Sequence, residues 1–126
     1  QACSTGPQPI KYGSDACDNC KMTIMDKRFA NEWVTDKSKV LKFDDVHCLV
    51  VFLKTNNSKG TAYINDYSGK GFFKATEMFF VNAQSLKSPM IGNIAAFTNL
   101  AAMTKVLSEQ SGKKLSWNEV QQEMKN

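Results

Sequence analysis

The sequence predicts an α+β domain made of two successive ββαβ units. Three observations lead to this expectation: two short strand-like segments occur twice in succession, helix-capping residues and an apolar helix follow each pair, and another short strand-like segment follows each helix. With 126 residues and 42% apolar composition, the chain also has a size that suits one compact domain.

The first unit is expected between about residues 20 and 75, and it begins with a hairpin. Apolar and polar residues alternate from Thr23 to Thr35, as in a strand with one buried face. The turn-forming sequence TDKSK follows, and the segment VLKF at 40–43 predicts a second strand. The two strands are therefore expected to pair.

A helix and a third strand complete the first unit. Asp44 and Asp45 have side chains that favour a helix N-cap, and the apolar stretch after them predicts a helix over 46–54. The polar sequence TNNSKG ends this helix, and TAYIND at 61–66 is expected to form the third strand.

The second unit, from about 76 to 126, repeats the hairpin. EMFFVNAQ at 77–84 is strand-like, SPMIGN at 88–93 has the composition of a turn, and IAAF at 94–97 is the second strand. The similarity between the two units is one of pattern and not of residue identity.

Two helices follow the second hairpin, with the short segment KLSW between them. Thr98 or Asn99 is expected to cap the first helix, and Ser116 with Glu119 forms a capping box for the second. The apolar residues of the first helix share one face: Leu100, Met103 and Leu107. The second helix is expected to bury Trp117, Val120 and Met124.

The first 14 residues differ in composition from the rest of the chain. They are polar and contain Gly and Pro, so we expect a processed, flexible tether over 1–14 before a single globular domain over 15–126. Ala2 directly before Cys3 resembles the end of a bacterial lipoprotein signal, which predicts lipidation of Cys3 and a place outside the cytoplasmic membrane. The alternative for Cys3 is a free thiol in a disordered tail.

Charge and hydropathy argue against two classes of function. Lys and Arg number 16 against 12 Asp and Glu, and they are scattered along the chain, so no nucleic-acid binding is expected. The apolar runs of the sequence are shorter than the roughly 20 residues that a membrane-spanning helix needs, so the domain itself is expected to be soluble.

Sulfur-containing side chains gather in the segment DACDNCKMTIMDKRF at 15–29. Cys17 and Cys20 form a CxxC pair, which allows a disulfide, a zinc corner, a redox dithiol or a soft-metal site. A zinc site would need further ligands from His47 and Cys48, which are also explained as helix-end and core residues. The redox alternative is disfavoured because the pair follows a loop and leads into a strand, not into a helix.

The methionines favour a soft-metal site, because a thioether is a poor ligand for zinc and a good one for Cu(I). Met22 lies two positions after Cys20, so an extended segment would place both side chains on one side. Met90 lies beside Pro89 in the expected turn, where filling a gap in the core is a weak explanation. Met25 is consistent with either role.

Three segments resemble blocks of the NosL family, the copper chaperones that accompany nitrous oxide reductase: CDNCKMTIMDKRFANEW, LKFDDVHCLVVFL and SPMIGNIAAFTNLAAM. The similarity spans residues 13–110 and points to the branch with paired cysteines. The resemblance implies two ββαβ units, distantly similar to part of organomercurial lyase, in a small periplasmic lipoprotein that is not an enzyme. It also implies nitrous oxide reductase and its assembly proteins as partners, with a membrane anchor at Cys3.

The resemblance further implies a ligand set for Cu(I). The family's Cys-x-Met motif falls on Cys20 and Met22, and its Pro-Met motif falls on Pro89 and Met90. We add Cys17 as a candidate for a fourth or exchangeable donor. The second-line candidates for metal binding are Met25, His47 and Cys48.

The chain departs from the family pattern at three positions, one of which is Cys17, because many members lack a counterpart of this residue. Many members have Gly between the Cys and the Met, where this chain has Lys21, and Gly directly after the second Met, where it has Ile91.

Two other functions stay open. Cleavage of a carbon–metal bond would need an acid beside the thiolates, for which the candidates are Asp15, Asp18 and Asp26. A dithiol redox protein or a zinc-stapled binding module is the other alternative. Loss of Cu(I) affinity on Met22→Ala is expected only for a copper chaperone.

Overall fold

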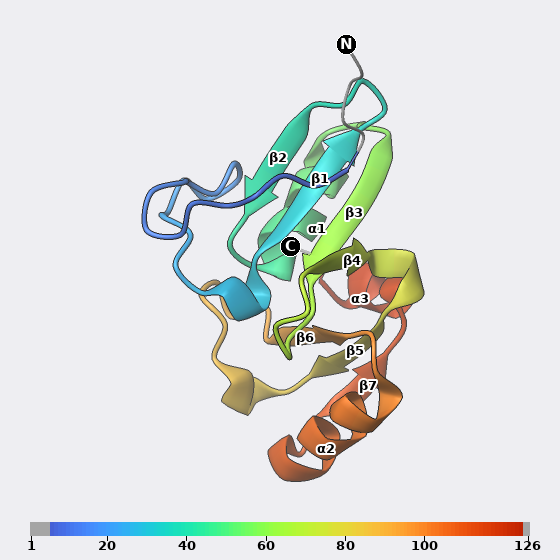
Figure 1. Cartoon of the computed structure of the whole chain (residues 1–126). Helices are drawn as coiled ribbons and strands as arrows, with labels where there is room; N and C mark the ends of the chain where they lie inside the picture. The colour runs from blue at the N-terminus through green and yellow to red at the C-terminus, as the bar shows by residue number, and fades with distance from the viewer. Residues whose placement is uncertain (1–5, 125–126) are drawn as a thin grey trace.

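Two antiparallel sheets form the framework of the protein, whose computed structural model describes residues 6–124 (Figure 1). The first sheet has the strand order β2-β1-β3-β4, and the second has the order β6-β5-β7. The strands of the first sheet are β1 (Asn31–Thr35), β2 (Val40–Phe43), β3 (Gly60–Asn65) and β4 (Phe72–Lys74). The strands of the second sheet are β5 (Phe79–Asn82), β6 (Ile94–Phe97) and β7 (Lys113–Leu115).

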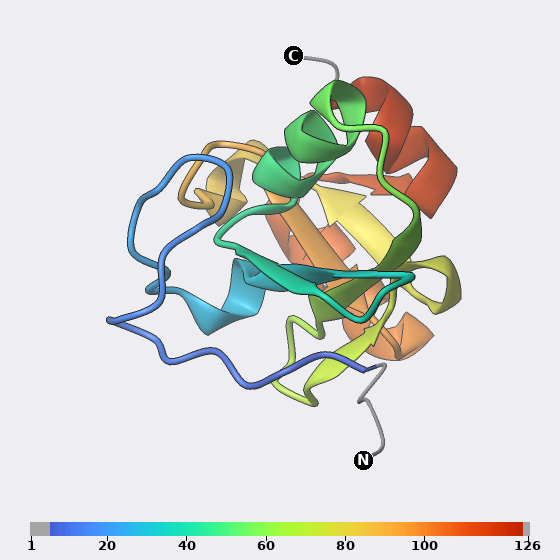
Figure 2. The same cartoon turned by 90° about the horizontal axis from the view of Figure 1, so that it is seen from above.

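Helix α1 (Val46–Thr55) covers one face of the first sheet, and the N-terminal segment crosses the other face (Figures 1 and 2). Asp45 begins the helix, because its carboxylate accepts a hydrogen bond from the His47 amide. The ring of Phe43 on β2 lies 5.5 Å from the ring of Phe52 on α1, so strand and helix share one apolar core.

The second sheet is buried on both faces. Phe80 contacts Trp117 of α3 (Trp117–Glu123), with ring centroids 5.6 Å apart, on the side of the first unit. Phe97 on β6 belongs to a second core cluster with Met103 of α2 (Leu100–Gln110), which lies under the outer face (Figure 1). Alternation along the strands thus supplies apolar side chains to two cores.

Both units have the order ββαβ, and in both the first strand lies between the second and the third. The expected α+β class with tandem ββαβ units is therefore confirmed. Local signals also placed the caps correctly: Asn99 caps α2, and Ser116 and Glu119 form a capping box at α3. Residues 6–124 also contain three short 3-10 helices. The first, η1 (Lys27–Phe29), precedes β1, whereas η2 (Ala75–Glu77) and η3 (Gln84–Leu86) lie between strands.

The structure differs from the sequence-based expectations in several elements. The strand expected from Thr23 to Thr35 begins only at Asn31, as β1. The segment before it contains the short helix η1, which the Asp26 carboxylate caps. The sequence pattern does not predict strand β4. In α2, Leu100 is half exposed instead of sharing the buried face with Met103, since it lies at the first helical position.

The part of the N-terminal segment that the structure describes contacts the first sheet. Ile10 is buried, and the Tyr12 hydroxyl accepts a hydrogen bond from Asn65 Nδ2 at 3.1 Å. Cys3 lies outside the described residues. Within residues 6–124, no helix has the length and apolar character needed to cross a membrane.

Candidate metal centre

Three thiols and one carboxylate meet where the N-terminal loop contacts the start of α1. Cys17, Cys20, Asp44 and Cys48 each offer one donor atom, and these four atoms lie within 4.8 Å of one another. Cys17, Cys48 and Asp44 are buried, and Cys20 is half-buried. Sulfur and carboxylate oxygen are both metal ligands, so this cluster is the candidate site.

A tight hairpin loop presents the two cysteines of the CxxC pair. The amide of Cys17 donates to the carbonyl of Met22 at 2.8 Å, and the amide of Lys21 donates back to the carbonyl of Cys17 at 2.9 Å. The amide of Cys20 donates to the sulfur of Cys17 at 3.5 Å. The loop therefore turns both thiols toward the same interior point.

Strand β2 holds this loop in place through Lys42. The Asp18 amide donates to the Lys42 carbonyl at 2.7 Å, and the Lys42 amide donates to the Asp18 carboxylate at 2.8 Å. The Lys42 ammonium also forms an ion pair with Asp15 at 2.8 Å. The aspartates considered as acids for bond cleavage thus include two whose carboxylates bind Lys42.

Helix α1 supplies the other two donors. Asp44 directly precedes the N-cap residue of the helix. Cys48 comes four residues after Asp44, which is about one helical turn, so the two side chains lie close together. Asp44 Oδ1 accepts hydrogen bonds from the thiol of Cys48 at 3.4 Å and from the thiol of Cys20 at 3.6 Å. Asp44 therefore links the N-terminal loop that contains Cys20 to helix α1.

The thiols differ in their affinity for protons. A hydrogen bond with Cys48 lowers the pKa of Cys17 to about 6, and the same contact raises the pKa of Cys48. Burial raises the pKa of Cys20. Cys17 is therefore the thiol of the cluster that loses its proton most readily.

Asp45 ties a turn of the second unit to the same end of α1. Its Oδ2 accepts hydrogen bonds from Ser88 Oγ at 2.6 Å and from the Met90 amide at 2.8 Å. A Cβ on Gly92 would lie 2.9 Å from the Cβ of His47, so the close approach of this turn requires glycine. These contacts fix the backbone of Met90 beside Asp45, the residue that directly follows Asp44 of the cluster.

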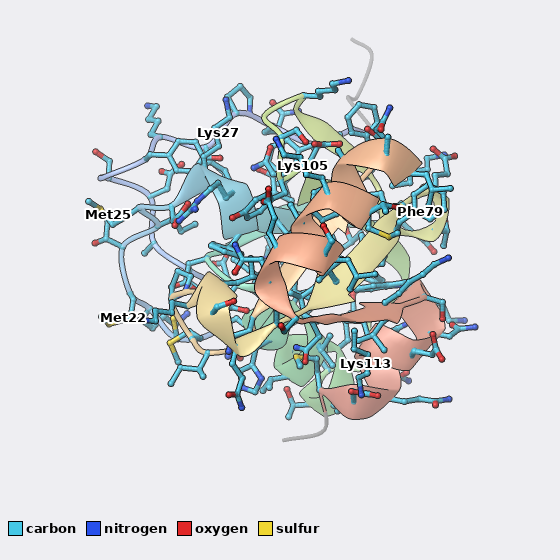
Figure 3. All side chains as sticks on the ribbon, turned by 90° about the horizontal axis from the view of Figure 1, so that it is seen from below. Met22, Met25, Lys27, Phe79, Lys105 and Lys113 are labelled. Atoms are coloured by element: carbon cyan, nitrogen blue, oxygen red, sulfur yellow. The ribbon has the colours of Figure 1, made fainter. Side chains whose placement is uncertain are left out.

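The three methionines considered as ligands lie at the surface of the protein. Met22 is 61% exposed, Met25 69% and Met90 36%. Figure 3 shows Met22 and Met25 at the outer edge of the N-terminal loop, with side chains that point away from the ribbon. The extended geometry expected at Cys20 and Met22 is absent, because Lys21 between them has a φ of +70°.

Two features of the cluster were not foreseen as central. Cys48 was only a second-line candidate, and Asp44 was interpreted as a helix cap. The spacing of four residues between Asp44 and Cys48 is the signal that could have paired them. His47 lies in the same turn of α1 but is not one of the four clustered donors.

A search of the chain against protein-family models matched the family described as NosL over residues 9–125. Among solved structures, the fold is similar to the crystal structure of the copper chaperone NosL from Shewanella denitrificans, with a TM-score of 0.78 and 23% sequence identity. The match covers 92% of this chain and 96% of that one. A search of curated proteins found no match.

Proposed function

Since the chain belongs to the NosL family, we propose that it is a copper chaperone that binds Cu(I) through sulfur and passes it to an acceptor protein. The observation that carries the proposal is the cluster of three cysteine thiols beside the fixed turn that contains Met90. Thiolate and thioether sulfur are the ligands that select Cu(I).

Cys20 is the thiolate ligand in this proposal, and Met22 and Met90 supply the thioethers. Cys20 is half-buried, whereas Cys17 and Cys48 are buried and both methionines are exposed. Cys17 is an exchangeable further donor, since its low pKa makes a thiolate available at neutral pH. The unbranched methionine side chains can reach an ion at the surface of the loop.

Transfer needs no catalysis in this arrangement, and we assign the protein no enzymatic activity. A Cu(I) ion with few ligands at the surface can accept a sulfur or nitrogen ligand from the acceptor before it leaves the chaperone. The exposed methionines are the ligands that would be exchanged first. Burial of Cys17 and Cys48 argues against a dithiol redox protein, because thiol exchange needs access to the attacking sulfur.

The acceptor that we propose is nitrous oxide reductase with its assembly proteins, in the periplasm of a denitrifying cell. Lipidation of Cys3 would anchor the chaperone to the membrane. Mass spectrometry of the protein from its native host should then show a lipid adduct on Cys3. An unmodified Cys3 in a disulfide with Cys17 or Cys20 would contradict the anchor.

Competition titrations with a Cu(I) chelator, on anaerobic reduced protein, test the copper site. Met22→Ala and Met90→Ala should each weaken Cu(I) binding, since each removes a soft ligand. Ile91→Ala is the matched control, because Ile91 is exposed beside Met90 and has no metal-binding atom. Equal affinities for all three variants would exclude the methionines from the site.

Delivery is tested separately, with the copper-loaded chain and copper-free nitrous oxide reductase. Copper should appear in the reductase when the two proteins are mixed, and a chelator of moderate affinity should not intercept it. Interception of all the copper would indicate release into solution and not transfer within a complex.

A further inference from the structure

Three exposed lysines converge at one end of the first sheet. Lys37 and Lys39 belong to the turn between β1 and β2, and Lys59 directly precedes β3. Together they line one surface hollow of about 420 Å³. The fold therefore gathers lysines that are scattered along the sequence, and this group of three is the basic tip of the protein.

Backbone contacts hold the two loops of the basic tip together. The Asp36 amide donates to the carbonyl of Lys59 at 3.0 Å, and the Thr35 amide donates to the carbonyl of Lys39 at 2.8 Å. A Cβ on Gly60 would lie 2.9 Å from the Cα of Thr35, so the start of β3 requires glycine to approach β1 this closely. The three lysine side chains thus extend from backbone that the sheet fixes in place.

Carboxylates do not neutralise the charge of the basic tip. Within residues 6–124, the ion pairs involve Arg28, Lys42 and Lys113, and none includes a lysine of the basic tip. Asp36 is the one acidic residue among those that line the hollow, so positive charges outnumber negative ones there by three to one. Such an excess of exposed positive charge favours an anionic partner.

The start of the described chain indicates a membrane as that partner. The Gln8 amide donates to Glu32 of β1, and Figure 1 shows the blue start of the chain reaching the arrowhead end of β1, which is the end that carries the basic tip. Cys3 is three residues before Gly6, which is a span of at most about 11 Å. A lipid on Cys3, which rests on the proposed function, would therefore hold the basic tip close to the phospholipid headgroups.

The metal cluster lies at the other end of α1. Cys48 is in the first turn of this helix, whereas Lys59 comes three residues after its C-cap residue, Asn56. A helix of this length spans about 15 Å. Contact between the basic tip and a membrane would therefore leave the metal cluster facing away from the bilayer, where an acceptor protein can reach it.

We propose that the basic tip binds the headgroup layer of a membrane that contains anionic phospholipids. The three ammonium groups attract the phosphate oxygens of the headgroups, and the contact orients the molecule with its metal cluster outward. This electrostatic contact is a property of the chain itself and does not require a lipid on Cys3.

Co-sedimentation of the full chain, produced without a lipid, with vesicles tests the binding. Vesicles of equal parts phosphatidylglycerol and phosphatidylcholine should bind the chain at low ionic strength, and vesicles of phosphatidylcholine alone should not. Added salt should weaken the binding, because it screens charges at the surface. No binding to the anionic vesicles, or equal binding to both kinds, would overturn the proposal. Neither result depends on copper or on Cys3, so a failure here is distinct from a failure of the proposed function.

Two triple variants of equal net charge locate the contact. Replacement of all three lysines of the basic tip by Gln should lower the partition coefficient about 100-fold, since each lysine near an anionic surface contributes about fivefold. The matched control replaces three exposed lysines elsewhere on the chain: Lys70, Lys74 and Lys105. This control should lose only a small part of the binding, and circular dichroism checks that both variants fold. Equal losses in the two variants would show that net charge alone attracts the protein, which would overturn the role of the basic tip.

Hydrogen exchange in the presence of the anionic vesicles tests the orientation. The amides at 35–39 and 57–60 should exchange more slowly, whereas those of the cysteine loop at 15–22 and of the turn at 88–93 should be unchanged. Protection of the cysteine loop instead would overturn the proposed orientation. Tighter binding to single-stranded RNA than to the anionic vesicles, lost on replacement of the same three lysines, would replace the membrane by nucleic acid as the partner of the basic tip.

Discussion

Lys21 and Ile91 both have left-handed backbone geometry, with φ of +70° and +60°. Each is adjacent to a methionine of the proposed copper site. These are the two positions where the resemblance to the NosL family places Gly in many members. A left-handed conformation costs a residue with a Cβ about 1 to 2 kcal/mol, and it is least favourable for a β-branched residue such as Ile91. Both residues thus have a backbone conformation that glycine adopts without this cost.

Replacement of Ile91 by glycine should therefore stabilise the protein. Ile91 is 79% exposed, so Ile91→Gly gives up little packing. We expect the free energy of unfolding to rise by up to about 1 kcal/mol, after the greater freedom of glycine in the unfolded chain is subtracted. Urea denaturation measures the change. Ile91→Val retains the branched Cβ and should be neutral, and a glycine variant less stable than the parent would contradict this explanation.

Glu32, the second residue of β1, has a buried carboxyl group with incomplete hydrogen bonding. One oxygen accepts from the Gln8 amide at 2.8 Å, and the other has no hydrogen-bond partner among the residues that the structure describes. Burial raises its pKa from 4.5 to about 7. Because the protonated form is favoured in the folded state, the contribution of Glu32 to stability is fully present below about pH 4.5 and is lost as the pH rises through about 7.

Glu32→Gln should remove this pH dependence. Relative to the parent, the variant should gain about 1 to 3 kcal/mol in the free energy of unfolding at pH 8 and much less at pH 5, since only the ionised carboxylate is penalised by burial. Urea unfolding at the two pH values provides the measurement. Glu77→Gln, at an exposed position, is the control and should behave as the parent. An equal gain at both pH values would exclude ionisation as the cause.

At the scale of elements, local sequence signals predicted those features that local contacts create. The capping box at α3 depends on Ser116 and Glu119, which are three residues apart, and such spacing is visible in the sequence. Strand β4 was missed because it has only three residues and is fixed by pairing with β3. Asp44 was missed as a thiol partner because Cys20 lies 24 positions away along the chain.

Asp45 links two elements, and its removal should affect both. Asp45→Ala removes the cap of α1 and leaves the Met90 amide without its acceptor, while the buried Ser88 hydroxyl can then donate only the longer hydrogen bond to Asn93 Oδ1 at 3.4 Å. We expect a loss of about 2 to 4 kcal/mol in the free energy of unfolding. Cu(I) affinity should fall as well, because the turn that contains Met90 is no longer fixed.

Asn99→Ala provides the comparison for Asp45→Ala. Asn99 caps α2 through the Ala102 amide and has no role in the turn beside the site. Its loss should cost about 1 kcal/mol and leave Cu(I) affinity unchanged. Similar losses of copper affinity in both variants would indicate a general effect of instability.

At the scale of the whole molecule, hydrogen bonds to two carboxylates of the first unit connect it to the second unit. Asp45 of the first unit binds the turn at 88–93, and Asp66 accepts hydrogen bonds from the amide and hydroxyl of Thr98 at 2.9 and 2.6 Å. The repeated ββαβ order was visible in the sequence, whereas the packing of one unit on the other was not. This packing depends on contacts between residues more than 30 positions apart, for which the pattern of a single sequence carries no signal.

Copper binding should stabilise the molecule as a whole if Met22 and Met90 share one ion, because the ion would then join both units. Binding to the folded state alone raises the free energy of unfolding by about 2.7 kcal/mol at a free Cu(I) concentration 100 times the dissociation constant. Any binding of Cu(I) by Cys17 and Cys20 in the unfolded chain would reduce this gain. Met90→Ala should lower the copper-induced stabilisation in thermal unfolding.

Without metal, the same variant should stay within about 1 kcal/mol of the parent, because Met90 is 36% exposed and fills little of the core. Comparison of apo and copper-loaded melting curves for parent and variant therefore separates binding from packing. A variant that melts much earlier as the apo protein but gains full stabilisation from copper would identify Met90 as a packing residue. The copper ligands would then all come from the first unit, and the metal would not join the two halves of the chain.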